Sequence, residues 1–248
     1  RFDEENNINW SETLIEAGCK VFYGFDDYKT HSKVCLITSI EDNQLHHITQ
    51  IGTGNYNEKT SELYTDHSFI TADQGIGEEA SKVFRNLAVQ QLTEESDKML
   101  VAPLRFKSVL LDEMDHVIAA ARMGRPASMI LKNNSISDRD IILKLQEASC
   151  AGVRIDMIVR GICCVRAEVP GKTENLHIRS LVGRYLEHGR IYSFRVKEVI
   201  NVLLDQREAY ILEHSSHFSE DVDLTIPGTF EAKGALHPIT QMKYDLND

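Results

Sequence analysis

The sequence contains no apolar run long enough to cross a bilayer. Its first ten residues, RFDEENNINW, lack both the basic segment and the apolar segment of a secretory signal peptide. The five cysteines are odd in number and form neither a Cys-x-x-Cys motif nor a zinc pattern with histidine. We therefore expect a cytoplasmic protein without a transmembrane segment, whose thiols are reduced and mostly buried.

Positive charge is also scarce over the chain as a whole, since its formal net charge is −11. Such a charge argues against a general affinity for nucleic acid or for anionic membranes. One segment differs, because nine basic residues stand against four acidic ones between Arg154 and Lys197, a local net charge of +5. This basic segment is either a solvated face or a path along which a polyanion binds.

The pattern of apolar and polar residues predicts a mixed α/β fold. With 248 residues, of which 42% are hydrophobic, the chain can bury a real core, and we expect two domains. The polar stretch 93–98 is the expected boundary, which gives domains 1–97 and 98–248. Helices are expected at 9–17, 77–92, 108–123 and 137–151. Strands are expected at 19–22, 34–37, 46–51, 68–72, 99–102, 128–131, 153–159 and 191–194.

Two parts of the chain repeat one order of elements, namely helix, glycine, strand, irregular segment, His-x-basic pair and apolar strand. The first part contains His31 with Lys33, and the second contains His188 with Arg190. The composition predicts about one such pair by chance, and His177 forms a third with a following arginine. Only the order of elements therefore distinguishes the two pairs, and it predicts two related α/β halves that face each other.

His31 stands two residues before Lys33, at the start of the apolar run 34–37. On an extended backbone, residues two apart point to the same face, so a strand here would place both side chains in one site. A neutral imidazole can attack phosphorus, and an ammonium group offsets phosphate charge. A histidine beside a lysine is more often ordinary surface, and this alternative stays open on the pair alone.

Four other residues have both a functional and a structural interpretation. Asn55 lies in the glycine-rich turn 52–55, which is either an anion-binding turn or the exit of a hairpin. Tyr64 and Asp66 could bond a phosphate and orient a histidine, or could pack at a strand edge. Arg160 follows a strand, where its planar guanidinium could bind phosphate in a bidentate manner or lie in solvent.

Five long motifs follow one another between residue 1 and residue 194. They are RFDEENNINW from residue 1, KTHSKVCLI from 29, IGTGNYNEKTSELYTDHSFITAD from 51, VRGICC from 159 and IRSLVGRYLEHGRIYSF from 178. Together they resemble the carboxy-terminal half of the ATP-dependent polyphosphate kinases that phosphorylate a histidine. The resemblance implies two phospholipase D-like α/β domains related by an internal duplication. It also implies reversible transfer of the ATP γ-phosphoryl group, through a phosphohistidine, to the end of a polyphosphate chain.

The resemblance implies a role for four residues at the reaction centre. His31 matches the nucleophile that is phosphorylated. His188 matches the opposing histidine, which binds phosphate and acts as general acid toward the leaving group. Tyr64 and Arg160 match residues that hold the phosphates of the nucleotide. Two histidines on opposing halves could align the attacking and leaving groups, as phosphoryl transfer requires.

Three further residues have supporting roles on this interpretation. Lys33 and Asn55 fit as groups that bind phosphate beside the nucleophile. Arg1 matches a position associated with magnesium, and because a guanidinium has no lone pair for a cation, we expect it to contact the phosphate that binds Mg²⁺. The ligands are then ATP or ADP and inorganic polyphosphate, with Mg²⁺ as cofactor and no nucleic acid. We expect a homo-oligomer that can associate peripherally with a membrane.

The sequence departs from the family pattern in three places. It begins inside a family motif, which predicts a fragment that can lack activity on its own. Thr38 stands where a full phospholipase D motif has an aspartate, which argues against a phosphodiesterase. The Ser-Ser-Ala-Asp motif expected after residue 194 is missing, and Ser215 and Ser216 are only a faint echo of it. Residues 196–212 have helical periodicity and resemble a later family helix, whereas 213–248 match no expected element.

Two other functions remain open. A phospholipase D-like phosphodiesterase would also use paired histidines, but it would hydrolyse a diester without ATP. A non-catalytic polyanion-binding fragment would keep the basic segment and tolerate the loss of His31.

Overall fold

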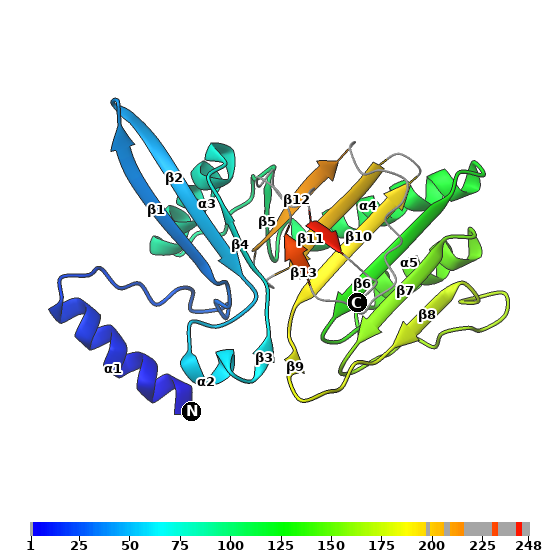
Figure 1. Cartoon of the computed structure of the whole chain (residues 1–248), viewed down its shortest axis with the longest axis horizontal. Coiled ribbons are helices and arrows are strands. Elements are labelled where there is room, and N and C mark those ends of the chain that lie inside the picture. The colour runs from blue at the N-terminus through cyan, green and yellow to red at the C-terminus, as the bar shows by residue number, and fades with distance from the viewer. Residues whose placement is uncertain (1, 197–198, 206–208, 216–229, 233–241, 245–248) are drawn as a thin grey trace.

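The chain folds into a mixed α/β structure, which confirms the predicted class (Figure 1). The computed structural model describes residues 2–196, 199–205, 209–215, 230–232 and 242–244. Its helices are α1 (Phe2–Glu16), α2 (Glu58–Ser61), α3 (Gln74–Ala88), α4 (Phe106–Arg122) and α5 (Arg139–Cys150). Its strands are β1 (Val34–Glu41), β2 (Gln44–Gly52), β3 (Tyr64–Thr65), β4 (Ser68–Thr71), β5 (Met99–Val101), β6 (Ala127–Asn133), β7 (Arg154–Val159), β8 (Leu176–Arg179), β9 (Leu186–Glu187), β10 (Arg190–Val196), β11 (Val199–Asp205), β12 (Ala209–Ser215), β13 (Phe230–Ala232) and β14 (Met242–Tyr244). Within the described part of the chain, no helix is long and apolar enough to cross a membrane.

The first sheet has three antiparallel strands in the order β1-β2-β4. β1 and β2 pair along their whole length as a hairpin. Its turn residues, Asp42 and Asn43, both have positive φ, which is the geometry of two-residue turns that match the twist of the strands. α3 covers one face of the sheet, where Ile76 joins a small core with Ile51 and Phe69. This face alone is packed, which limits how much apolar surface the first sheet can bury.

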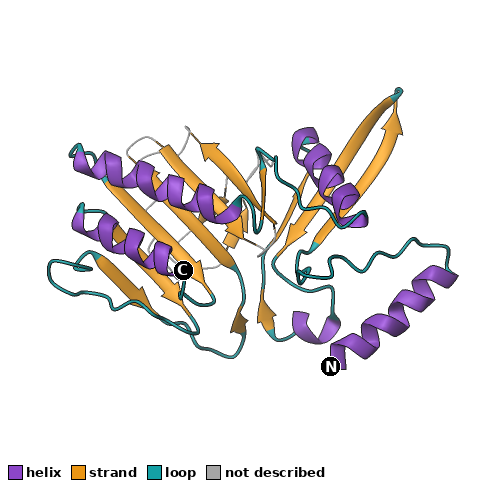
Figure 2. Ribbon diagram, turned by 180° about the vertical axis from the view of Figure 1, so that it is seen from behind, coloured by secondary structure: helices purple, strands orange, loops and turns teal. Residues whose placement is uncertain are grey.

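The second sheet has seven strands in the order β5-β12-β11-β10-β6-β7-β8. β6, β7 and β8 run parallel to one another, and the other neighbours are antiparallel. Figure 2 shows α4 and α5 lying along one face of this sheet. Between them lies the larger core, in which Met114, Leu145, Ile155 and Phe194 are almost fully buried. Burying one such side chain contributes roughly 1.5–3 kcal/mol, so the second half holds most of the packing energy.

A short parallel pairing of β3 with β9 joins the two parts of the molecule (Figure 1). Leu186 N donates to Leu63 O at 2.8 Å, and His188 N donates to Thr65 O at 3.1 Å. These bonds fix the segment before β10 against the segment before β4. The histidine of the second half is therefore anchored to the backbone of the first half.

Most predicted elements lie close to observed ones. The confirmed strands are those at 34–37, 46–51, 68–72, 99–102, 128–131, 153–159 and 191–194, and the confirmed helices are those at 108–123 and 137–151. The helix predicted at 77–92 is observed as α3, which begins earlier because Asp73 caps it by accepting from Ile76 N at 2.9 Å. Asp138 caps α5 in the same way, in place of the expected Ser137.

The strand predicted at 19–22 is wrong, because these residues are irregular. The equivalent strand of the second half, β7, pairs with the parallel strand β6, which precedes α5. No strand in the described part of the chain lies beside residues 19–22 to pair with them. The helix predicted at 9–17 is observed as α1, which begins earlier, at Phe2, so that Asn9 lies within it. Gly18, with φ of +87°, does follow the end of the helix as predicted.

The helix predicted at 196–212 is wrong as well. This region forms β11 and β12, which extend the large sheet from β10 to β5. Pairing with neighbouring strands thus outweighed the helical periodicity of the sequence in this region. Ser215 ends β12, whereas Ser216 lies outside the described residues.

The cysteines are all free, as predicted, but all five are exposed, so the expectation of mostly buried thiols is wrong. Cys35, in the predicted strand 34–37, shows why a thiol in a strand can be exposed. Val34 and Leu36 pack against the small core, whereas Cys35 and Ile37 point to the other face and are exposed. Because α3 covers only one face of the first sheet, alternate residues of β1 remain in solvent.

Candidate functional site

His31 lies in the loop immediately before β1, in contact with Lys33. Lys33 is only 6% exposed, and its Nζ lies 2.6 Å from His31 Nδ1 and 3.2 Å from His31 Nε2. Lys33 Nζ also donates to the carbonyl oxygen of His31. Because an ammonium group can only donate, the imidazole nitrogen that it contacts is an acceptor, and the His31 ring is neutral in this contact. The two side chains share one face, although the backbone here is a loop rather than the expected strand.

His188 lies just before β10 and is only 8% exposed. Its Nδ1 is 2.7 Å from Asp66 Oδ1, and the same oxygen accepts from the Thr53 hydroxyl at 2.8 Å. Burial alone would raise the pKa of the Asp66 carboxyl, but the hydrogen bonds with His188 and Thr53 lower it below its ordinary value. An ionised Asp66 accepts the Nδ1 proton of His188, which leaves Nε2 as the ring nitrogen that faces away from this contact. The Tyr64 ring lies beside this imidazole, with the ring centroids 5.1 Å apart.

A hydrogen-bonded path connects the two histidine segments. The carbonyl oxygen of Lys33 accepts from Gly52 N at 2.9 Å. The next residue, Thr53, donates through its hydroxyl to Asp66, which in turn bonds His188. A side chain on Gly54 would place its Cβ 2.7 Å from Asp66 Oδ2, so the turn after β2 fits against the carboxylate only without one. The turn thus supports the Asp66–His188 pair from the first half.

Basic residues gather at the sheet edge next to His188. β6 and β7 are parallel and β10 is antiparallel to β6, so the carboxyl ends of β6 and β7 meet the beginning of β10. Lys132 near the end of β6, Arg160 directly after β7 and Arg190 at the start of β10 therefore share one edge. Lys132 Nζ is paired with Glu187 Oε2 at 2.6 Å. The edge is suited to anionic groups because its cations outnumber the neighbouring carboxylates.

The structure brings together some of the predicted residues and not others. His31 contacts Lys33, Tyr64 lies beside His188, and Arg160 shares the sheet edge with His188. Asn55 is exposed in the turn after β2. Arg1 lies outside the described residues.

Four residues that contribute to this geometry were not singled out from the sequence: Thr53, His67, Lys132 and Glu187. Their contacts with the site join distant parts of the chain. The Lys132–Glu187 pair, for example, spans 55 residues. Asp66 was one of the residues with two interpretations, and its bond to His188 supports the one in which a carboxylate orients a histidine.

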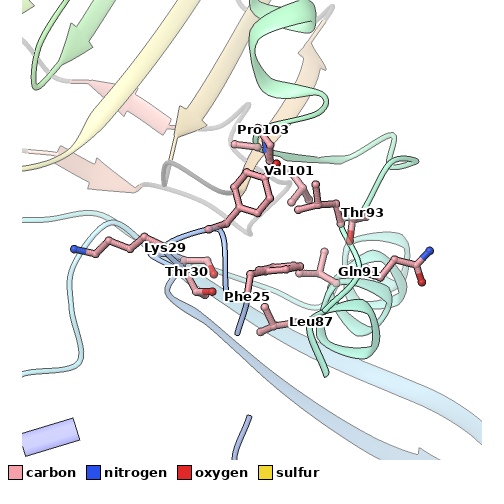
Figure 3. Close-up of a pocket in the computed structure, with 13 residues that line it drawn as sticks. Phe25, Lys29, Thr30, Leu87, Gln91, Thr93, Val101 and Pro103 are labelled. Carbon is pink, nitrogen blue, oxygen red and sulfur yellow. The ribbon is translucent and has the colours of Figure 1, made fainter. Parts of the chain in front are cut away.

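A cavity of about 230 Å³ lies beside the His31 loop (Figure 3). Its lining is mainly apolar and includes Phe25, Leu87, Val101 and Pro103, together with Thr30 next to His31. Lys29 is its one cationic residue, and Figure 3 shows the amino group pointing away from the other lining side chains. This cavity therefore lacks the charge that a phosphate site needs, in contrast to the edge beside His188.

Carboxylates of the site are already engaged by protein groups. Asp66 bonds His188 and Thr53, and Glu187 bonds Lys132. Over the residues whose placement is described, no group of three or more His, Cys, Asp or Glu side chains is arranged to hold a metal ion. These residues therefore do not form an oxygen cage of the kind that binds a divalent cation by protein groups alone.

The fold and these contacts define an α/β protein in which one histidine of each half, His31 or His188, contacts a charged partner, and hydrogen bonds connect the two histidine segments. Comparison with known proteins identifies the class more closely. The model of the polyphosphate kinase C-terminal domain 1 matches residues 1–93, and that of C-terminal domain 2 matches residues 99–225. The chain therefore belongs to the polyphosphate kinase family.

Individual relatives agree with this assignment. The polyphosphate kinase of Staphylococcus saprophyticus is 47% identical over 194 residues, which cover 78% of this chain and 27% of the relative. That of Pseudomonas aeruginosa is 39% identical over 234 residues, covering 94% of this chain and 33% of the relative. The crystal structure of polyphosphate kinase from Porphyromonas gingivalis matches with a TM-score of 0.76 and 32% identity, over 86% of this chain and 36% of that one. The chain thus spans roughly a third or less of these two sequence relatives.

Proposed function

We propose that this chain is the catalytic portion of a polyphosphate kinase, which transfers the γ-phosphoryl group of ATP reversibly to the end of a polyphosphate chain. The observation that carries the proposal is the pair of histidines, each with a charged partner, at the two ends of one hydrogen-bonded path. Membership of the polyphosphate kinase family supports this choice of reaction.

In the proposed first step, a ring nitrogen of His31 attacks the γ-phosphorus with its lone pair. The bond from that phosphorus to the bridging oxygen of ADP breaks, and ADP leaves with the electron pair. In the second step, a terminal oxygen of polyphosphate attacks the phosphohistidine, and the nitrogen–phosphorus bond breaks. Both steps depend mainly on alignment and on neutralisation of phosphate charge.

The contact of Lys33 with His31 supports a role for both residues in the first step. It keeps the His31 ring neutral, as a nucleophile must be. It also keeps an ammonium group within 3.2 Å of both ring nitrogens. An arriving phosphate is a stronger acceptor than an imidazole, so Lys33 turns to the phosphate and releases the lone pair. Asn55, exposed nearby in the turn after β2, would bond the phosphate through its amide.

His188 is proposed to bind phosphate and to protonate the leaving oxygen. Asp66 holds the ring through Nδ1, so that Nε2 is the nitrogen that would contact the phosphate and donate the proton. Tyr64, whose ring lies beside that of His188, would donate from its hydroxyl to the same phosphate. Arg160 would bond phosphate oxygens through its guanidinium from the adjoining sheet edge.

Mg²⁺, on this proposal, arrives bound to the nucleotide phosphates. Mg²⁺ commonly binds substrate phosphates with only one or two protein carboxylates. The engaged states of Asp66 and Glu187 agree with this, and no step of the proposal passes through the ion. Arg1, outside the described residues, is proposed to contact a phosphate.

We also propose that the two halves, 1–97 and 98–248, are phospholipase D-like domains related by duplication. The separate family matches to residues 1–93 and 99–225 support the division. The shared order of helix, helix-ending glycine and His-x-basic pair supports the relationship. A cytoplasmic location fits the proposed use of ATP, whereas the homo-oligomer and the peripheral membrane association stay predictions from the family resemblance.

The proposal is tested by incubating the parent enzyme that contains this chain with ATP labelled in the γ-phosphate. We expect label on the protein that is lost in acid and kept in base, and His31→Ala should abolish it. His46→Ala, which changes an exposed histidine of the β1–β2 hairpin, is the matched control and should keep full labelling. Label that persists in His31→Ala would contradict the proposal.

Other outcomes distinguish the alternative functions. Polyphosphate binding that is unchanged in His31→Ala, with no labelling of the wild type, would favour a non-catalytic polyanion-binding module. Hydrolysis of a phosphodiester in the absence of ATP would favour a phosphodiesterase.

A further inference from the structure

His67 lies against the backbone of the residue that follows His188. A Cβ added to Gly189 would approach His67 Cδ2 and would lie 2.5 Å from His67 Nε2. Real Cβ atoms do not approach other atoms so closely, so either the imidazole or the backbone would have to move. The ring of His67 thus occupies the space that a side chain at position 189 would need. Gly189 is itself buried, which leaves little room for such a movement.

Consecutive residues of the two halves contact one another around this position. Asp66 holds the imidazole of His188, and the next residue, His67, lies against Gly189. On the other side of His188, Glu187 is tied to Lys132 by an ion pair of 2.6 Å. The backbone of the 187–189 segment is also bonded to the first half through His188 N and Thr65 O. Each residue of 187–189 therefore has its own contact.

The backbone of His67 is fixed independently of its ring. His67 N donates to the Thr53 hydroxyl at 2.9 Å, and Thr53 N donates to His67 O at 2.9 Å. Because Thr53 also bonds Asp66, a displacement of His67 is transmitted to the carboxylate that holds His188. Thr53 thus couples the position of His67 to that of the Asp66 carboxylate.

We propose that His67 is a positioning residue, whose ring packs against Gly189 and thereby sets the orientation of the His188 imidazole toward Asp66. The requirement is that positions 67 and 189 fit each other: a flat ring at position 67 leaves no room for a side chain at position 189, whereas a small residue at position 67 does. The inference rests on the proposed function for what His188 does to substrate, but the orientation of His188 can be measured without turnover.

Burial, together with the nearby ammonium of Lys132, lowers the pKa of His67 from 6.5 to about 4. Asp66 and Glu187 oppose this decrease only in part. The ring is therefore uncharged at neutral pH, so a phenyl ring should replace it without introducing or removing charge.

The test uses the proton held between His188 Nδ1 and Asp66 Oδ1, which should give a low-field proton resonance in the full chain. Asp66→Asn should remove this resonance and so assign it. Gly189→Ala should remove or shift it, and should lower kcat for polyphosphate synthesis by about tenfold to a hundredfold, as expected for a small misplacement of a catalytic group. The double variant His67→Ala with Gly189→Ala should recover both, because the clash is gone. His67→Phe should keep both.

Gly183→Ala is the matched control, because a Cβ on Gly183 meets nothing within 4 Å. It should leave the resonance and kcat unchanged. An unaltered resonance and kcat in Gly189→Ala, or no recovery in the double variant, would overturn the positioning role. If the resonance follows the expected pattern but the wild type never labels His31, the proposed function fails while the positioning of His188 stands.

Discussion

The helix before the first His-x-basic pair and the helix before the second have similar local sequences but different surroundings. α5 buries Ile141, Leu145 and Ala148 against the large sheet and is followed by the paired strand β7. α1 leaves Trp10 67% exposed and Leu14 45% exposed, and the residues after it are irregular. The apolar segment that follows the helix and glycine thus forms a strand only where a parallel neighbouring strand is available.

The two histidines also differ in how closely their surroundings hold them. His188 is buried and held by Asp66, by a backbone bond and by its neighbours' contacts, whereas His31 lies half-buried in a loop with Lys33 as its ring contact. A group that orients substrate benefits from such rigidity. A nucleophile that must meet ATP and then polyphosphate benefits from a less confined position. The contrast agrees with the roles proposed for them.

The largest expected difference between the halves lies in the packing of two matched leucines. Leu145→Ala should lower the free energy of unfolding by about 2–5 kcal/mol, because Leu145 is fully buried. Leu14→Ala should change it by less than about 0.5 kcal/mol, because Leu14 is largely exposed. Urea unfolding followed by circular dichroism measures both. Equal losses would mean that α1 packs as tightly as α5.

A second expected difference concerns stability in acid, and it arises at His67, where the two halves meet. Because the folded state lowers the pKa of His67 from 6.5 to about 4, the unfolded chain binds this proton more readily. Stability should therefore fall by roughly 3 kcal/mol as the pH decreases from about 6.5 to 4, and should be unaffected above that range. His67→Phe should remove this loss, measured by urea unfolding at pH 7 and pH 4.

The control is His46→Phe on the exposed hairpin, which should keep the pH dependence of the wild type. If His67→Phe also kept it, the buried imidazole would not be the source of the acid sensitivity.

A smaller difference is expected between the two helix-ending glycines. Gly18 and Gly152 have φ of +87° and +89°, and neither has an atom within 4 Å of an added Cβ. Alanine at such φ costs about 1–2 kcal/mol where the backbone cannot relax. Gly152→Ala should show this loss because buried Val153 and β7 follow it, whereas Gly18→Ala should lose less than about 0.5 kcal/mol. Equal losses in thermal or urea unfolding would contradict the difference in packing.

Local features of the fold could be predicted from the sequence, because local patterns determine them. The β1–β2 hairpin, the helix-ending glycines and the capped α5 depend on residues that are near in the chain. The strand at 19–22 and the helix at 196–212 were wrong, because distant pairing partners decide both.

The site, like the fold, could be predicted from the sequence only in part. Long motifs were enough to select His31 and His188, since each lies within a continuous match. The contacts that hold His188 were not predictable, because the Asp66–His188 bond joins residues 122 apart. The close approach of His67 to Gly189 likewise depends on the pairing of β3 with β9, which no local pattern predicts.

The most direct test of the roles assigned to the two histidines is to identify the residue that is phosphorylated. The parent enzyme that contains this chain is incubated with ATP and digested at neutral to basic pH, and its peptides are sequenced by mass spectrometry. We expect phosphate on the peptide that contains His31 and none on the peptide that contains His188. Phosphate on His188 with none on His31 would contradict the assignment of the nucleophile.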